Sequence, residues 1–206
     1  MNKSSIVAVA VLALVGGFVI SWIINANRPI ELEAGTWFGE QARALPAFEL
    51  RDHNGQALTR ASLNGKWNLI FFGFTHCPDV CPTSLQTLAD MLRAIDGPDV
   101  ASALRVVFVS VDPERDSAEI LASYVGYFNP DFIGATADLD KLTPLTRSLG
   151  IMHAFRNKTE GNPVYDVEHS ATIVLVNPQA ELAGVFGAPH DALALARDMT
   201  RIVEHN

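Results

Sequence analysis

The two cysteines, Cys77 and Cys81, are the residues whose type and spacing most directly suggest chemistry. They are the only cysteines among the 206 residues of the chain, and they lie four positions apart. A disulfide across so short a segment would stabilise the fold little, and one pair is too few for the disulfide framework of a small secreted domain. Thiolates bind soft metal ions such as Cu(I) and Zn(II), and they attack disulfides. The pair therefore predicts either a metal site or a redox site.

The residues around the pair predict where a helix begins. Pro82 lacks a backbone N–H, which a helix tolerates only in its first turn, so we expect the helix to begin near Asp79 or Val80. A helix N-terminus favours a thiolate over a thiol. Redox enzymes of the thioredoxin type separate their cysteines by two residues, whereas three residues intervene here. In a helix this spacing sets the two Cα atoms about 6 Å apart, which still permits a disulfide, so both chemistries stay open.

A histidine is the expected third ligand, because two thiolates alone leave a coordination position of the bound ion vacant. The chain has six histidines: His53, His76, His153, His169, His190 and His205. His169 is the best candidate, since it lies just before the apolar stretch 171–176, and in thioredoxin-like folds the loop before that strand packs against the cysteine motif. Together with the two cysteines it would form a trigonal site, which suits Cu(I), whereas Zn(II) seeks a fourth ligand. Asp166 or Glu168 could orient the imidazole, and the sequence does not decide between them.

Other polar residues near these positions have weaker claims to a role. His76 is expected to pack or hydrogen-bond beside the motif, with metal ligation as the alternative. Met152 and His153 are metal-binding types, but one pair is a weak signal. Asp79 is expected as a helix cap, with metal ligation as the alternative. Residues 112–116 are expected as a turn and helix start, with a part in the site or in a partner surface as the alternative.

Hydrophobic periodicity predicts the elements that position these residues. We expect strands at 47–50, 56–59, 67–74, 105–111, 132–136, 171–176 and 181–186. We expect helices at 84–95, 116–128, 138–149 and 191–204. This order predicts an α/β fold with a mixed central sheet flanked by helices. A cysteine motif that follows the first core strand and opens a helix is typical of the thioredoxin-like fold.

The N-terminal part of the chain predicts a membrane anchor. Residues 6–24 are apolar and uncharged, and as a helix they would span roughly 28 Å, close to the hydrocarbon thickness of a bilayer. Lys3 favours a cytoplasmic N-terminus. A cleaved signal peptide is the alternative, and either one places the remainder outside the cytoplasm. We expect a stub and anchor at 1–27, a linker at 28–45 and one domain at 46–206. The net charge of −8 argues against a nucleic-acid-binding surface.

At these residues the chain resembles the Sco/SenC family of copper chaperones. Residues 72–82, FGFTHCPDVCP, are similar to the family's central motif, and residues 109–116, VSVDPERD, to a second family block. His169 corresponds to the family's third copper ligand, although Glu168 stands beside it where the family usually has an aspartate. The resemblance covers roughly residues 45–204.

The resemblance implies a thioredoxin-like copper protein that takes part in cytochrome c oxidase assembly. It implies an anchor in a bacterial or mitochondrial inner membrane, and we expect the bacterial inner membrane, a single N-terminal span and a domain in the periplasm. The implied cofactor is copper as Cu(I), with Cu(II) left open. The implied partners are the copper-site subunit of cytochrome c oxidase and other copper chaperones or thioredoxin-like reductants.

Two functions of different classes fit these residues. A metallochaperone would bind Cu(I) through Cys77, Cys81 and His169 and pass it on by ligand exchange. A thiol–disulfide oxidoreductase would attack a target disulfide with Cys77 and resolve the mixed disulfide with Cys81, with little need of His169. Both can coexist, because an oxidised pair cannot bind Cu(I). A thiol peroxidase is disfavoured, because Phe74 stands three residues before Cys77, where such enzymes place Thr or Ser.

Overall fold

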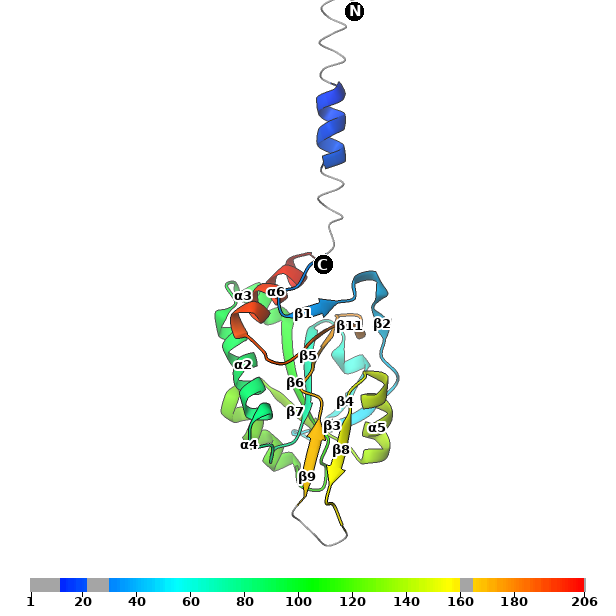
Figure 1. Cartoon of the computed structure of the whole chain (residues 1–206), viewed down its shortest axis with the longest axis vertical. Helices are drawn as coiled ribbons and strands as arrows, with labels where there is room; N and C mark the ends of the chain where they lie inside the picture. The colour runs from blue at the N-terminus through cyan, green and yellow to red at the C-terminus, as the bar shows by residue number, and fades with distance from the viewer. Residues whose placement is uncertain (1–11, 22–29, 160–164, 206) are drawn as a thin grey trace, which may run out of the picture. The chain divides into compact units, whose positions relative to one another are not determined.

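The computed structural model describes residues 12–21, 30–159 and 165–205. The chain divides into two units, residues 1–30 and 31–206, and residues 12–21 of the first unit are helical (Figure 1). No helix within the described ranges is long and apolar enough to cross a membrane. The expected span 6–24 lies partly outside those ranges, so the anchor stays a prediction.

The second unit is built on a nine-stranded mixed sheet. Its strands lie in the order β1-β11-β10-β5-β6-β7-β3-β4, and β2 also pairs with β11. Their bounds are β1 Gly35–Trp37, β2 Arg43–Ala44, β3 Glu49–Asp52, β4 Ala57–Thr59, β5 Trp67–Gly73, β6 Leu104–Ser110, β7 Ile133–Thr136, β10 Ile173–Val176 and β11 Glu181–Phe186. The central strands β5, β6 and β7 run parallel, whereas β10 is antiparallel to β5. A separate two-stranded sheet joins β8 (His153–Arg156) to β9 (Asp166–His169).

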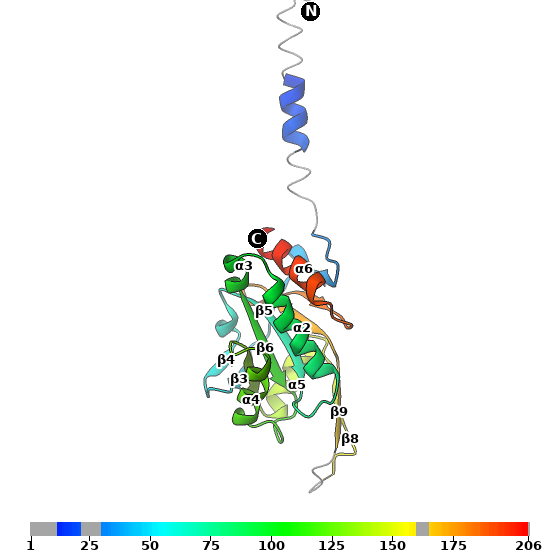
Figure 2. The same ribbon diagram turned by 90° about the vertical axis from the view of Figure 1, so that its left-hand side faces the viewer.

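Helices cover both faces of the central sheet (Figures 1 and 2). They are α2 Val80–Ala94, α3 Pro98–Ala103, α4 Ala118–Phe128, α5 Leu139–Ser148 and α6 Ala192–His205, with short 3-10 helices at Gly39–Gln41 and Ala61–Leu63. Helix α2 packs with α4 and α6 on one side, and α5 lies on the other, where Leu142 and Leu145 join the core cluster of Phe72 and Val109. All seven residues of β5 are buried, as its continuous apolar run predicts for a strand covered on both faces.

The predicted order of strands and helices is confirmed within the domain. Helix α2 begins at Val80 after Asp79, and α4 is capped by Ser117, whose hydroxyl accepts a hydrogen bond from the N–H of Ile120 at 3.4 Å. The sequence analysis does not predict α3 or the β8–β9 hairpin. Their short sequences, PDVASA in α3 and HAFR and DVEH in the hairpin, contain few large apolar side chains, so hydrophobic periodicity does not mark them.

Part of the stretch 28–45, which the sequence analysis expects to be a linker, belongs to the sheet. Strand β1 pairs with β11 along Gly35 to Trp37, and the Trp37 ring lies 5.8 Å from that of Trp67. Buried Asp198 of α6 accepts hydrogen bonds from the N–H groups of Glu33 and Ala34 at 2.8–3.0 Å. The segment is therefore held by edge pairing and a carboxylate, two contacts that leave no periodic signal in the sequence.

Candidate metal centre

The two cysteines lie where β5 ends and α2 begins. Cys77 is in the connecting loop and is partly exposed, whereas Cys81 is in the first turn of α2 and is fully buried. A Cβ atom at Gly73 would lie 2.5 Å from the Sγ atom of Cys81, so a residue without a side chain is needed at the end of β5. The local sequence thus brings the strand backbone directly against the buried sulfur.

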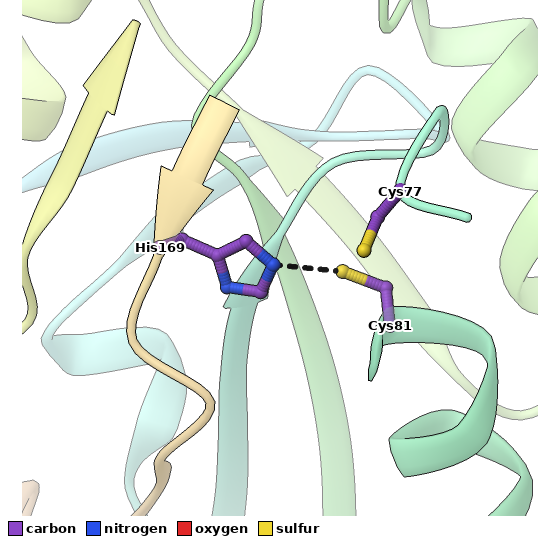
Figure 3. A group of neighbouring side chains, drawn as sticks. All are labelled: Cys77, Cys81 and His169. Atoms are coloured by element: carbon purple, nitrogen blue, oxygen red, sulfur yellow. Dashed lines mark hydrogen bonds between the residues drawn. The ribbon is translucent and has the colours of Figure 1, made fainter. Parts of the chain in front are cut away.

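His169 lies 88 residues after Cys81 in the sequence but beside it in the structure. It ends β9, and its Nε2 atom lies 3.2 Å from Sγ of Cys81 (Figure 3). Its ring packs edge-to-face against Phe71 and Phe74, with centroid distances of 6.0 and 5.8 Å. The donor atoms of Cys77, Cys81 and His169 all lie within 4.8 Å of one another. The structure therefore brings together the three side chains that the sequence predicts as ligands.

The orientation of the imidazole comes from the backbone. The Nδ1 atom of His169 lies 3.2 Å from the carbonyl oxygen of Ser170, and a proton on Nδ1 leaves the Nε2 lone pair facing the sulfurs. Glu168, expected as a possible orienting group, instead pairs with Arg156 at 2.8 Å. Asp166 lies at the opposite end of β9. The expectation that one of these carboxylates orients His169 is therefore wrong, because side chains alternate along a strand while the next carbonyl stays close.

The two thiols differ in acidity. A hydrogen bond from Cys81 lowers the pKa of Cys77 to about 4, against the effect of burial, and His169 and the N–H groups of Asp79 and Cys81 add to this lowering. The same hydrogen bond, in which Cys81 is the donor, raises the pKa of Cys81 above its usual range, and burial and the charge on Cys77 add to this rise. At neutral pH the metal-free pair therefore holds one thiolate, on the more exposed cysteine, and one thiol.

A buried carboxylate fixes the loop that carries Cys77. Asp116 accepts hydrogen bonds from the N–H of Thr75 at 3.0 Å, from the Thr75 hydroxyl at 2.6 Å and from the Ser110 hydroxyl at 2.5 Å. His76 lies at the edge of this network: its Nδ1 atom is 3.1 Å from the Thr75 hydroxyl, and its side chain is 54% exposed. His76 hydrogen-bonds beside the motif, as expected, and is not among the three grouped donors.

A second buried carboxylate holds the strand that carries His169. Asp112 accepts hydrogen bonds from the Tyr165 hydroxyl at 2.6 Å and from Nε of Arg115 at 2.5 Å. Arg115 also donates from Nη1 to the carbonyl oxygen of Tyr165 at 3.0 Å, and its guanidinium lies 3.7 Å from the centre of the Tyr165 ring. Tyr165 directly precedes β9, so this contact ties β9 to the segment after β6.

Sequence reasoning missed the role of Tyr165 and treated residues 112–116 mainly as a turn. The signal that was available is the pair of aspartates in the second family block, Asp112 and Asp116, because a carboxylate so close to a buried strand needs partners. The partners themselves lie 41 and 53 positions away in the sequence, which no local pattern reveals.

The donor set fits a soft metal ion. Bonds of about 2.3 Å to sulfur and about 2.0 Å to nitrogen would place the donors of a trigonal site about 4 Å apart. The observed separations, 3.2 Å for one pair and none above 4.8 Å, bracket that value. A cavity of about 340 Å³, whose lining includes Cys77, His169, Arg115 and Tyr165, adjoins the donors. An ion bound here would be reachable by the ligands of another protein.

Comparison with known proteins identifies similar chains. The family model described as SCO1/SenC matches residues 39–204. A putative copper-binding protein of Stutzerimonas stutzeri is 35% identical over 163 residues, 79% of this chain and 78% of that protein. The mitochondrial SCO2 homolog of Mus musculus is 34% identical over 154 residues, which span 75% of this chain and 60% of that relative's length. The structure of Bradyrhizobium japonicum ScoI with copper bound matches with a TM-score of 0.67 and 35% identity, over 77% of this chain and 98% of the other.

Proposed function

The chain belongs to the SCO1/SenC family and has a thioredoxin-like fold, and from this premise we propose that it is a copper metallochaperone. Cys77, Cys81 and His169 bind one Cu(I) ion as cargo. The observation that supports this most directly is the grouping of the three donor atoms within 4.8 Å. Two thiolates and one imidazole form a soft, three-coordinate set, which suits Cu(I) better than Zn(II).

The acceptor that we propose is the copper-site subunit of cytochrome c oxidase, with other copper chaperones or thioredoxin-like reductants as further partners. The family membership supports this choice. Cys77 is partly exposed, so the ligands of the acceptor can reach the ion at this cysteine. An incoming donor can displace Cys77 first, because Cys81 and the strand that carries His169 are more firmly enclosed. Transfer then proceeds by exchange of ligands without a change in the oxidation state of the ion.

We further propose that residues 6–24 anchor the chain in the bacterial inner membrane, with the domain in the periplasm. The uncharged apolar composition of that stretch supports an anchor. Extraction of membranes with carbonate tests the anchor: the full chain is expected to stay in the membrane pellet, and a chain lacking residues 1–27 in the soluble fraction. A full chain released by carbonate would contradict it.

The proposed cargo is tested by titrating the full chain, reduced and in detergent, with Cu(I) under anaerobic conditions. One equivalent is expected to bind tightly. His169→Ala is expected to weaken binding by about 100-fold or more, because it removes one of three direct ligands, and loss of a group that only orients a ligand already costs about 10- to 100-fold. His205→Ala is the matched control, because His205 is an exposed histidine at the end of α6. An unchanged affinity in His169→Ala would refute the three-ligand site.

The unequal acidity of the cysteines also supports a second function, thiol–disulfide reduction of a copper-site target. The Cys77 thiolate would attack one sulfur of the target disulfide and release the other as a thiol. Cys81 would then lose its proton, attack Cys77 and free the second target thiol, which leaves a Cys77–Cys81 disulfide. With copper chelated, the reduced chain is expected to reduce one equivalent of a disulfide peptide, in His169→Ala as well as in the wild-type protein, and Cys77→Ser is expected to reduce none. No reduction by the wild-type protein would leave the chaperone function alone.

A further inference from the structure

Two potential metal ligands lie beside His169 and take no part in the site described above. His153 of β8 is the direct cross-strand partner of His169. Met152 is held to the residue after His169: the N–H of Ser170 donates to the Met152 carbonyl at 2.9 Å, and the N–H of Met152 donates to the Ser170 hydroxyl at 3.0 Å. Directly opposed residues of antiparallel strands project to the same face, with Cβ atoms about 4.5–5.5 Å apart. A second imidazole therefore lies on the same face of the hairpin as an expected copper ligand, and the backbone hydrogen bonds with Ser170 hold Met152 beside that pair.

A cavity connects these residues. Its volume is about 730 Å³, and Met152, His153 and His169 are among the residues that line it, together with Leu139 and Thr143 of α5. His169 also lines the smaller cavity of about 340 Å³ that Cys77 borders. His169 therefore lines both the cavity beside Cys77 and the cavity of Met152 and His153.

Both side chains are available for binding. The Met152 side chain is 78% exposed, whereas Met91 and Met199 are fully buried in the core. Within the described part of the chain, the recorded contact of the His153 ring is an edge-on packing against Phe155, at 6.3 Å between centroids, and no hydrogen bond occupies its nitrogens. An exposed thioether and an unpaired imidazole are soft, neutral donors of the kind that Cu(I) accepts.

We propose that Met152, His153 and His169 form a second, weaker Cu(I) position through which the ion enters and leaves the cysteine site. This inference rests on the proposed function. In the exchange, bonds from the ion to the sulfurs of Cys77 and Cys81 break, and bonds to the Met152 sulfur and a His153 nitrogen form. His169 stays bound through Nε2, because its Nδ1 carries the proton that faces the Ser170 carbonyl. The ion remains Cu(I), and the freed Cys81 thiolate takes up one proton from solvent. Binding is weaker because neutral donors replace two thiolates.

The position is tested in the Cys77→Ser/Cys81→Ser variant of the full chain in detergent, with Ag(I) as a redox-inert probe of Cu(I) binding. In methyl-labelled methionine NMR spectra, Ag(I) is expected to shift the Met152 signal, while the signals of buried Met91 and Met199 stay in place and report that the fold is intact. Adding His153→Ala is expected to weaken the Ag(I) response about 10-fold or more, and adding His205→Ala to leave it unchanged. The proposal would be overturned if Ag(I) did not shift the Met152 signal, or if His153→Ala did not change that shift.

A kinetic experiment tests the same position with both cysteines present. The chain carrying Met152→Leu and His153→Ala, loaded with one Cu(I), is expected to release the ion to a chelator about 10-fold more slowly than the wild-type chain, at nearly equal equilibrium affinity. His205→Ala again serves as the control. Equal release rates would exclude the position as a route for the ion. A wild-type chain that takes up no Cu(I) at all would instead refute the proposed function, while the Ag(I) result on Met152 would stand separately.

Discussion

At the scale of single residues, the two cysteines of the motif differ in charge and in exposure. Cys77 carries the negative charge because a thiol and several N–H groups donate to its sulfur, and Cys81 keeps its proton because it is buried beside that charge. The charged sulfur of Cys77 is accessible to solvent and to a partner protein, whereas the sulfur of Cys81 forms the buried side of the site. The same asymmetry serves metal transfer and thiol exchange.

The lowered pKa of Cys77 predicts how the metal-free protein reacts with alkylating agents. A thiolate with a pKa of about 4 is fully charged from pH 5.5 upward, whereas an ordinary cysteine, with a pKa near 8.5, gains charge about tenfold per pH unit over that range. We therefore expect the iodoacetamide rate of Cys77 in the folded chain to be almost constant between about pH 5.5 and 8, followed by mass spectrometry. In urea the rate should rise steeply with pH. A steep rise in the folded chain as well would contradict the predicted thiolate.

At the scale of elements, the site depends on a hairpin that lies outside the central sheet. Among the described residues, β8 and β9 pair with each other and not with the strands of that sheet. The buried contact of Tyr165 with Asp112 and Arg115 anchors β9, just as Asp116 anchors the cysteine loop. The segment after β6 therefore supplies both carboxylates, and it sets the distance between the histidine and the cysteines.

Replacing Tyr165 by Phe tests this anchoring role. The substitution removes the hydroxyl and keeps the ring beneath Arg115, so Asp112 loses one of its donors. We expect a loss of about 1–3 kcal/mol in the free energy of unfolding, measured in urea, and a weaker affinity for Cu(I), because His169 is less well placed. The matched control is Tyr127→Phe, since Tyr127 is 82% exposed. A Cu(I) affinity equal to that of the wild-type protein would show that β9 is held without this contact.

At the scale of the whole molecule, the sheet of residues 31–206 includes two strands, β1 and β2, that precede the first strand predicted from the sequence. Strands β1 and β2 cover the edge of β11, and Asp198 receives the N–H groups that lead into β1. The three-residue strand β1 then forms the edge of the sheet, and so short an edge strand offers other chains little surface for pairing. The segment that joins the domain to residues 1–30 is therefore part of the fold from Glu33 onward.

Removing the Asp198 carboxylate should loosen this segment without changing the metal site. Asp198→Ala is expected to lower the free energy of unfolding by about 2–3 kcal/mol, because charged hydrogen bonds to backbone N–H groups are lost, and to speed hydrogen exchange at residues 33–37. The Cu(I) affinity should stay within about twofold, because distant sites act independently. Asp198→Asn, which keeps an acceptor, should be milder. Unchanged exchange at residues 33–37 would show that strand pairing alone holds the segment.

Local sequence patterns account for the chemistry of the cysteine motif and for most of the helices and strands. The continuous apolar run of β5, the proline in the first turn of α2 and the spacing of Cys77 and Cys81 are local patterns, and each indicates a structure confined to neighbouring residues. His169 could be chosen among six histidines because it precedes a core strand, which is also a local feature.

The way in which the histidine strand, the cysteine loop and the N-terminal strands come together depends on tertiary contacts. The Ser170 carbonyl, not a carboxylate, lies beside Nδ1 of His169, and Tyr165 and Asp112 fix its strand from positions 53 residues apart. Segments 35–37 and 43–44 are strands because they pair with the edge of β11, and with three and two residues they are too short for their own sequence to indicate a strand. Such contacts depend on which backbone groups and burial sites the assembled sheet leaves open, and a sequence pattern read over a short window carries no record of them.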